Sequence, residues 1–421
     1  MNAHHNKSWI LILVLVCVML QIPMAGHAFV VSFGGSPHDP AAVRSSAAEV
    51  LYATDRDGRE VKLVGTDSSL LEGTILDLGM PSVGPDGTVF FGAAFRRNDR
   101  VRWEIFAANP DTHSLSRVAL STPTAALEMI TDPTPLAQSD GSIVFAARDL
   151  SRGGDGLYHL KNSQLSCLVR VGTKLDGNHV LRNIGFGSFS AAGGEAVAFT
   201  GQVTRVGKVE LLVANRKVTV QAAVGGKAPD RARYRDLGPP AVRGDNVAFT
   251  ALTDRGSAAY AYSRGKVGTV LTTGSPCAGG KITYVSQDRL GLGPDGTVAV
   301  GAICSGSPAI FLVRRSEATM LASATREPDH SGFVDLDMPS LLETGTVLFN
   351  ASKGDGMGLY SIHLNFGSSV TGGAALPLIP GVDPAQAPLH SILTVSVASN
   401  QQGRLAYLGG PVESLASVPN E

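Results

Sequence analysis

The sequence is poor in the residues that identify most kinds of site. Its 421 residues include four cysteines and two tryptophans, and only 6% of the chain is aromatic. Charged residues make up 17% of it, whereas an average soluble chain has about 25%. The 35 basic and 36 acidic residues nearly balance, and no run of Lys and Arg stands out. A nucleic-acid-binding protein needs a basic stripe, so we expect no nucleic-acid partner.

Motifs for catalysis are also missing. There is no Gly-x-Ser-x-Gly segment for a nucleophilic serine and no His-Glu-x-x-His segment for zinc. Gly185-Phe186-Gly187 lacks the Lys-Ser/Thr that completes a phosphate-binding loop. The sequence therefore favours a protein without a catalytic site.

The chain contains a single long hydrophobic run. Residues 9–20 (WILILVLVCVML) follow Lys7 and precede the small residues Gly26 and Ala28. This order is typical of a secretory signal, and the run is short for a membrane span. An uncleaved anchor helix is the alternative. We predict a signal peptide at 1–28, a secreted or periplasmic protein, and no membrane span after cleavage.

Glycine is abundant, with 49 residues, and much of it belongs to a repeat. A turn followed by a short apolar strand, as in PDGTVFF or RGDNVAF, occurs seven times at intervals of 49 to 58 residues. Each copy is accompanied by a hairpin of alternating apolar residues, which makes four strands per unit. This period predicts an all-β, seven-bladed β-propeller. The copies end at Phe91, Phe145, Phe199, Phe249, Val300, Phe349 and Tyr407.

The order of strands predicts how the ring closes. The repeat begins with a hairpin at 49–65 and ends with two inner strands at 391–408. If the hairpin completes the last blade, no strand edge is left exposed at the seam. We therefore predict a propeller over 49–410, with a leader at 29–48 and a tail at 411–421. An open solenoid and a pair of β-sandwiches are the alternatives.

Two short motifs point to a known group of proteins. GEAVAF at 194–199 and DNVAF at 245–249 carry a Gly-x-Val-Ala-Phe core, and Gly-Leu-Tyr occurs at 156–158 and 358–360. The chain resembles secreted bacterial tandem-repeat proteins whose unit reads Asn-x-x-Gly-x-Val-Ala-Phe. This resemblance implies a propeller-like fold and no established activity.

Equivalent polar residues enter the inner strands of most units. In a closed ring they would form a circle at the mouth of the central channel, where four carboxylates are suitable ligands for Ca²⁺. We therefore predict a metal site at Asp77, Asp132, Asp236 and Asp335. The alternative is that each side chain caps its own turn. The equivalent residues are Asp77, Asp132, Asn183, Asp236, Asp335 and Thr394, and the remaining unit has Ser286 to Asp288 in that neighbourhood.

Histidines and cysteines give further candidates. His179, His330 and His390 each precede one of these polar positions and are alternative ligands, for a transition metal. Solvent-facing loop residues are the other interpretation. Cys277 and Cys304 share one unit, which in an oxidising compartment permits a disulfide, with two free thiols as the alternative. Cys167 is then left over, and we expect it to be a small buried residue.

The function that these features favour is binding. We predict an exported, monomeric, non-catalytic binding or scaffolding propeller that requires no cofactor and meets an unknown protein or small ligand through its loops. The alternative is a metal-assisted hydrolase or lyase with its site at the mouth of the central channel.

Overall fold

A computed structural model describes most of the repeat region. The chain divides into units at residues 1–42 and 43–421, and every described residue belongs to the second. The predicted signal peptide, leader and tail therefore lie outside the described residues. The described residues are 50–66, 68–70, 73–98, 100–118, 127–129, 134–149, 154–175, 179–192, 196–214, 217–244, 246–263, 265–324, 333–341, 345–353, 356–366, 370–372, 376–377, 391–392, 398–399 and 404–410.

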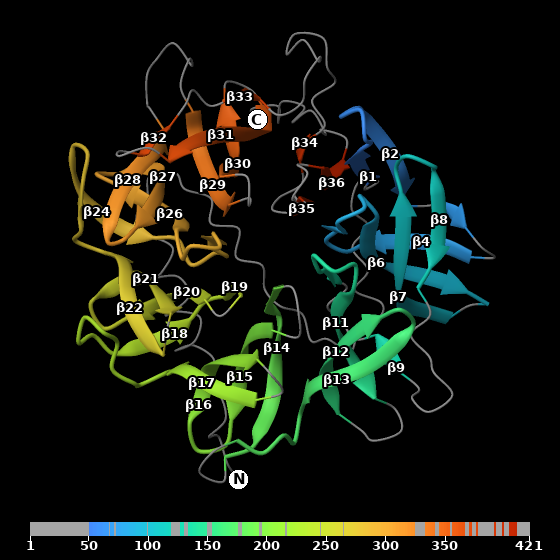
Figure 1. The fold of residues 1–421 in the computed structure, drawn as a ribbon, viewed down its shortest axis with the longest axis horizontal. Helices are drawn as coiled ribbons and strands as arrows, with labels where there is room; N and C mark the ends of the chain where they lie inside the picture. The colour runs from blue at the N-terminus through green and yellow to red at the C-terminus, as the bar shows by residue number, and fades with distance from the viewer. Residues whose placement is uncertain are drawn as a thin grey trace, which may run out of the picture. The chain divides into compact units, whose positions relative to one another are not determined.

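The fold is the predicted all-β, seven-bladed propeller (Figure 1). Seven antiparallel sheets surround a centre, and each has four strand positions, which we name A (innermost) to D (outermost). Blade 1 contains β3 (Ser69–Leu70), β4 (Gly73–Leu78), β5 (Ser82–Val83), β6 (Val89–Arg97), β7 (Arg100–Asn109) and β8 (Ser114–Arg117). Blade 2 contains β9 (Leu127–Met129), β10 (Leu136–Ala137), β11 (Ile143–Asp149), β12 (Asp155–Lys161) and β13 (Gln164–Arg170). Blade 3 contains β14 (Leu181–Ala192), β15 (Ala196–Val203), β16 (Gly207–Ala214) and β17 (Lys217–Ala223).

The remaining blades follow the same plan. Blade 4 contains β18 (Tyr234–Leu237), β19 (Ala241–Arg243), β20 (Asn246–Thr253), β21 (Gly256–Ser263) and β22 (Lys266–Thr272). Blade 5 contains β23 (Pro276–Cys277), β24 (Gly280–Val285), β25 (Gly291–Leu292), β26 (Val298–Cys304), β27 (Ser307–Arg314) and β28 (Glu317–Ser323). Blade 6 contains β29 (Phe333–Leu341), β30 (Thr346–Lys353), β31 (Gly356–Phe366), β32 (Val370–Gly372) and β33 (Leu376–Pro377). Blade 7 contains β34 (Ser391–Ile392), β35 (Ala398–Ser399), β36 (Leu405–Gly410), β1 (Val50–Thr54) and β2 (Glu60–Gly65).

Blade 7 confirms the predicted closure, because it combines strands from both ends of the repeat. β1 pairs with β36 in antiparallel register, from Val50 opposite Gly409 to Ala53 opposite Ala406. Leu51 and Ala53 are fully buried in the apolar cluster that also contains Ala406 of β36 and residues of blade 1, so the seam is part of the core. Among the described residues, no helix has the length and hydrophobicity that crossing a membrane requires.

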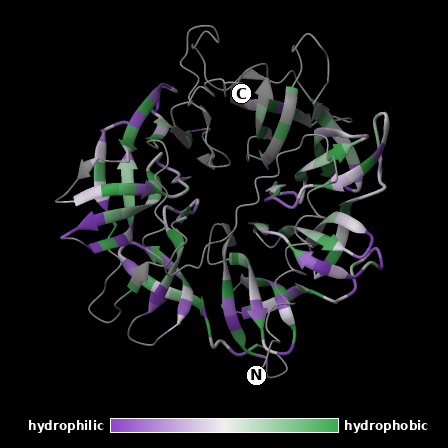
Figure 2. Ribbon diagram, turned by 180° about the vertical axis from the view of Figure 1, so that it is seen from behind, coloured by the Kyte–Doolittle hydropathy of each residue, from purple (hydrophilic) through white to green (hydrophobic). Residues whose placement is uncertain are grey.

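The core consists of apolar clusters between neighbouring blades. The phenylalanines that end most of the repeat phrases are buried in these clusters: Phe91, Phe145, Phe199 and Phe249 are fully inaccessible. Figure 2 shows the hydrophobic residues concentrated along the strands. Packing between blades therefore explains the regular phenylalanines of the repeat.

Two features recur that the sequence did not predict. Strand A has a register shift in blades 1, 3, 4, 5 and 6, for example between Ile75 and Asp77 and between Tyr234 and Asp236. In addition, a small hairpin joins strand D of one blade to strand A of the next, at residues 172–181, 225–234 and 274–282. Each of these D–A hairpins begins with a glycine whose φ is positive: Gly172, Gly225 or Gly274. A residue with a side chain rarely adopts a positive φ.

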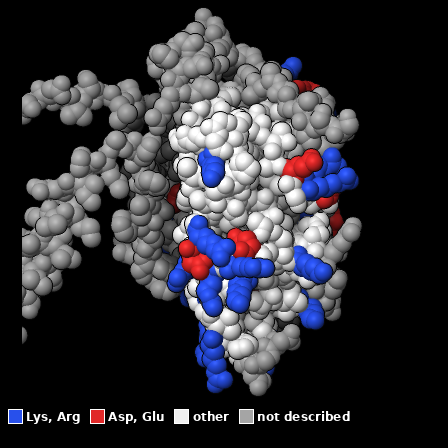
Figure 3. All heavy atoms as spheres, turned by 90° about the vertical axis from the view of Figure 1, so that its left-hand side faces the viewer, with Lys and Arg blue, Asp and Glu red and all other residues white. Residues whose placement is uncertain are grey.

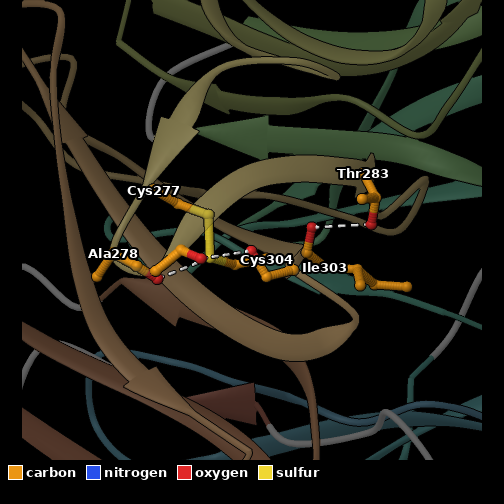
Figure 4. Close-up of a disulfide and its surroundings, with 7 residues drawn as sticks. Cys277, Ala278, Thr283, Ile303 and Cys304 are labelled. Atoms are coloured by element: carbon orange, nitrogen blue, oxygen red, sulfur yellow. Dashed lines mark hydrogen bonds between the residues drawn. A yellow bond between two sulfur atoms is a disulfide. The ribbon is translucent and has the colours of Figure 1, made fainter.

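For the cysteines, the structure settles one alternative that the sequence left open and shows one prediction to be wrong. Cys277 and Cys304 form a disulfide that fastens the D–A hairpin of blade 5 to the end of β26 (Figure 4). Cys167 was expected to be buried, but it is exposed. It lies on β13, the outermost strand of blade 2. A register shift separates Cys167 from Val169 on this strand, and Val169 is buried.

Candidate binding groove between blades 3 and 4

Two carboxylates of the predicted metal rim, those of Asp77 and Asp236, bind the backbone of their own strand. Oδ1 of Asp77 accepts a hydrogen bond from the Leu78 amide at 3.0 Å, and Oδ1 of Asp236 accepts one from the Leu237 amide at 2.9 Å. Both amides follow the register shift in strand A. At such a shift the regular hydrogen bonds between strands are interrupted, so a backbone N–H group needs another acceptor. Asp236 also receives Nζ of Lys208 from blade 3 at 2.7 Å. These contacts match the alternative in which each side chain caps its own turn.

Blade 5 shows what happens without this aspartate. The equivalent residue is Tyr284, which has no carboxylate to accept a hydrogen bond from the next backbone amide. The next amide, of Val285, instead donates to Oγ of Ser257 from the neighbouring blade at 2.6 Å. The same backbone donor is thus satisfied by a different side chain, which indicates that the position serves the fold.

The other members of the predicted rim are not brought together by any observed contact. Asn183 is exposed on β14, Asp335 pairs through its backbone with Ser352, and near Tyr284 the Ser286 hydroxyl donates to Asp288. Asp132 and Thr394 lie outside the described residues. Within the described part of the chain, no three His, Cys, Asp or Glu side chains are grouped as a metal site requires.

Of the three histidines, the structure describes only His179. Its Nδ1–H donates to the Thr204 carbonyl at 2.9 Å, and the Val180 amide donates to the Thr204 hydroxyl at 2.7 Å. His179 therefore fastens the D–A hairpin of blade 3 to the adjoining turn. His330 and His390 lie outside the described residues.

A groove opens between the outer strands of blades 3 and 4. It has a volume of about 430 Å³ and is lined by residues 220–223 of β17, residues 226–229 of the D–A hairpin, Tyr234 and Val267 of β22. Ala222, Ala228 and Tyr234 are buried members of the apolar cluster between the two blades, and Val267 packs against it. A space of this size with apolar walls is typical of a binding site.

The D–A hairpin beside the groove is basic. Lys227, Arg231 and Arg233 are exposed, while Ala232 and Tyr234 between them are buried. The Arg233 guanidinium donates to the Gly225 carbonyl at 3.0 Å, and that of Arg255, in the next turn, donates to the Asp230 carbonyl at 3.2 Å. Because these partners are neutral carbonyls, both side chains keep their positive charge available to a ligand.

The sequence already contained the signal for this basic hairpin. The segment KAPDRARYRD at 227–236 alternates cations with apolar residues, as a half-buried strand does. It escaped notice because the whole-chain balance of charge is neutral and acidic residues interrupt the run. A local count of charge by loop would have found it.

A buried carboxyl group lies beneath the groove. Glu210 of β16 pairs across the sheet with Ala222, is 0% exposed, and has no hydrogen-bond partner for either oxygen. Burial raises the pKa of Glu210 well above its usual value, although Lys208 opposes the shift. In other blades the equivalent residue is apolar and fully buried: Leu51, Ile105, Leu157, Ala259 and Ile310.

Burial also keeps the tyrosines near the groove uncharged. It raises the pKa of Tyr260, and the nearby Asp230 carboxylate raises it further. The pKa of Tyr234 is raised by the same two causes, burial first. The floor of the groove therefore contains no phenolate under physiological conditions.

Comparison with known proteins identifies no family. No protein-family model matches the chain, and no curated protein matches it. The β-propeller domain of the Trilobed protease from Pyrococcus furiosus is 10% identical over 72% of this chain and 84% of that one, with a TM-score of 0.41. An oligogalacturonate lyase in complex with manganese is 12% identical over 88% and 98%, with a TM-score of 0.48.

A third similar structure is a Pyrococcus horikoshii acylaminoacyl peptidase, 11% identical over 77% of this chain, with a TM-score of 0.42. This chain spans about half of that protein, 48% of its length. Likenesses at this level assign no activity, substrate or metal to this chain.

Proposed function

We propose that this protein is an exported binding module that holds its partner in the groove between blades 3 and 4. The groove itself is the observation that supports the proposal, since it is open, exposes apolar and polar surface in similar amounts and lies beside exposed cations. On β17, which lines it, Val220 is 47% exposed, the highest value among the large hydrophobic residues that the structure describes as exposed. Export is part of the proposal because of the apolar run at 9–20 and the small residues at 26–28.

Paired substitutions in blades 3 and 4 test this function. Val267 lines the groove, whereas Val218 has the same place in blade 3 and packs against a different cluster. We expect V267S to lose at least tenfold in the recovery of a crosslinked partner from the compartment of export, and V218S to match the wild type. Equal recovery by wild type, V267S and V218S would refute the groove as the binding site.

A further inference from the structure

One wall of the groove is the free edge of a sheet. β17 is the last strand of blade 3, and its only strand partner among the described residues is β16. Four consecutive residues of this strand, 220–223, line the groove. An edge strand presents unpaired N–H and C=O groups on its outer side, which an added strand can bind.

The floor of the groove suits a small aliphatic side chain. Ala222, Ala228 and Val267 leave space over the cluster that contains Tyr234 and Tyr260. These residues offer apolar contact, and the polar side chains of the lining are those of Gln221, Lys227 and Tyr234. The shape therefore favours an occupant with one aliphatic group directed inwards.

The rim of the groove favours negative charge. Within the described part of the chain, no carboxylate forms an ion pair with Lys227 or Arg231, and both residues are exposed. Asp230 and Asp254 lie close by and accept the Ala232 and Arg233 amides. The cations of this region outnumber these two carboxylates: they are Lys227, Arg231, Arg233 and Arg255. On the side of the ring seen in Figure 3, Lys and Arg side chains gather around a few acidic ones.

Together these features define the chemistry of the occupant. We propose that the groove binds an extended, acidic segment of a partner protein. The backbone of this segment pairs with the free edge of β17, one aliphatic side chain enters the floor, and flanking carboxylates meet Lys227 and Arg231. This inference rests on the proposed function and names the partner class for the same site.

A polypeptide fits these observations better than an acidic glycan does. Residues repeat every 3.3 Å or so along an extended chain, which matches the donors and acceptors of an edge strand. A sugar ring lacks this spacing and is usually bound by exposed aromatic faces, whereas Tyr234 in this groove is only 3% exposed.

Selection from a random heptapeptide phage library tests the inference. The full chain without residues 1–28 is immobilised, and the selected consensus peptide is then measured by fluorescence polarisation. We expect a consensus with at least two Asp or Glu residues around one Val, Leu or Ile. Its affinity should fall at least tenfold in the double variant K227E/R231E, and it should weaken as NaCl is raised.

A matched control is available in blade 3. Lys174 has the place of Lys227 in the preceding D–A hairpin and is also exposed, so K174E should change the affinity less than twofold. Both lysines are on the surface, and we expect all of these variants to fold. A neutral or basic consensus, the absence of any consensus, or heparin binding that K227E/R231E abolishes without any peptide being selected would overturn the inference.

The two proposals fail in distinguishable ways. A partner whose recovery depends on Val267 but is not displaced by the consensus peptide would leave the binding function standing and refute the acidic segment. If neither partner nor peptide depends on Val267, both proposals are refuted.

Discussion

Two neighbouring interfaces of this ring use the same strand positions and fill them differently. Between blades 4 and 5, Ala259 is fully buried and Ser257 accepts the Val285 amide at 2.6 Å. Between blades 3 and 4, the equivalent residues are Glu210, buried without a partner, and Lys208, which pairs with Asp236. Residues that break a local rule are found chiefly at functional sites. The comparison therefore indicates that the interface beneath the groove gives up some stability.

The largest expected effect comes from moving the carboxyl group into the tighter interface. Ala259→Glu places an unpaired carboxyl, and extra volume, where the wild-type side chain is 0% exposed. We expect the free energy of unfolding at pH 7 to fall by at least about 4 kcal/mol, measured by urea denaturation. Thr269→Glu, at an exposed site on the same blade, is the control and should stay within about 0.5 kcal/mol of wild type. A variant A259E as stable as wild type would remove the distinction between the interfaces.

The reverse exchange should stabilise the protein. Glu210→Leu restores the apolar side chain of the other blades, and we expect a gain of about 1–3 kcal/mol at pH 7. Its size depends on pH, because the folded-state pKa of Glu210 is raised above the unfolded value near 4.5. The neutral carboxyl's contribution to stability is complete below the unfolded pKa and is lost as pH rises through the folded pKa.

The pH dependence gives this prediction its own control. The advantage of E210L over wild type should grow from pH 4.5 upwards, until the folded-state pKa of Glu210 is passed. Thr269→Leu, at an exposed position without a titratable group, should show no such trend. If the difference between E210L and wild type stays constant from pH 4 to pH 8, the buried carboxyl is not the cause.

The smallest effects concern the donors left by the register shift in strand A. Ser257→Ala removes the acceptor of a buried amide and should cost about 1–3 kcal/mol, whereas Asp236→Ala, on a more exposed strand position, should cost about 0.5–1.5 kcal/mol. Thermal unfolding with and without EDTA tests whether the Asp236 carboxylate also binds a metal ion. If EDTA lowers the midpoint of thermal unfolding in wild type but not in D236A, the alternative of a metal-assisted hydrolase or lyase is favoured instead.

Local patterns were sufficient to predict the architecture. Alternating residues and turns repeat in each unit, so the blade, the number of blades and the closing hairpin at 49–65 followed from neighbouring residues alone. The disulfide between Cys277 and Cys304 joins two residues of one unit, so the sequence could suggest the pair, with two free thiols as the alternative. Features that depend on register between strands were missed, among them the shift before Asp236 and the exposure of Cys167.

The groove was missed because its parts come from separate repeats. Residues 220–223 and Val267 belong to different blades, and only packing of the blades brings them together. Glu210 reads in the sequence as an ordinary polar position in a strand, and its burial depends on the neighbouring blade. Of the predicted rim, Asp77, Asp236 and Asp335 lie on strand A of their blades, Asp132 lies outside the described residues, and the metal remains a prediction.

The pairing of β1 with β36 sets the timing of assembly during synthesis. Leu51 and Ala53 are among the first residues of the repeat to be made, yet their partner strand, Leu405–Gly410, is among the last. Through nearly the whole of translation the edge of β1 that faces β36 must wait for its partner strand, although the hairpin already pairs within itself and packs against blade 1. A ribosome that stops short of residue 405 would release a product in which this edge of β1 stays unpaired, and an exposed strand edge promotes aggregation.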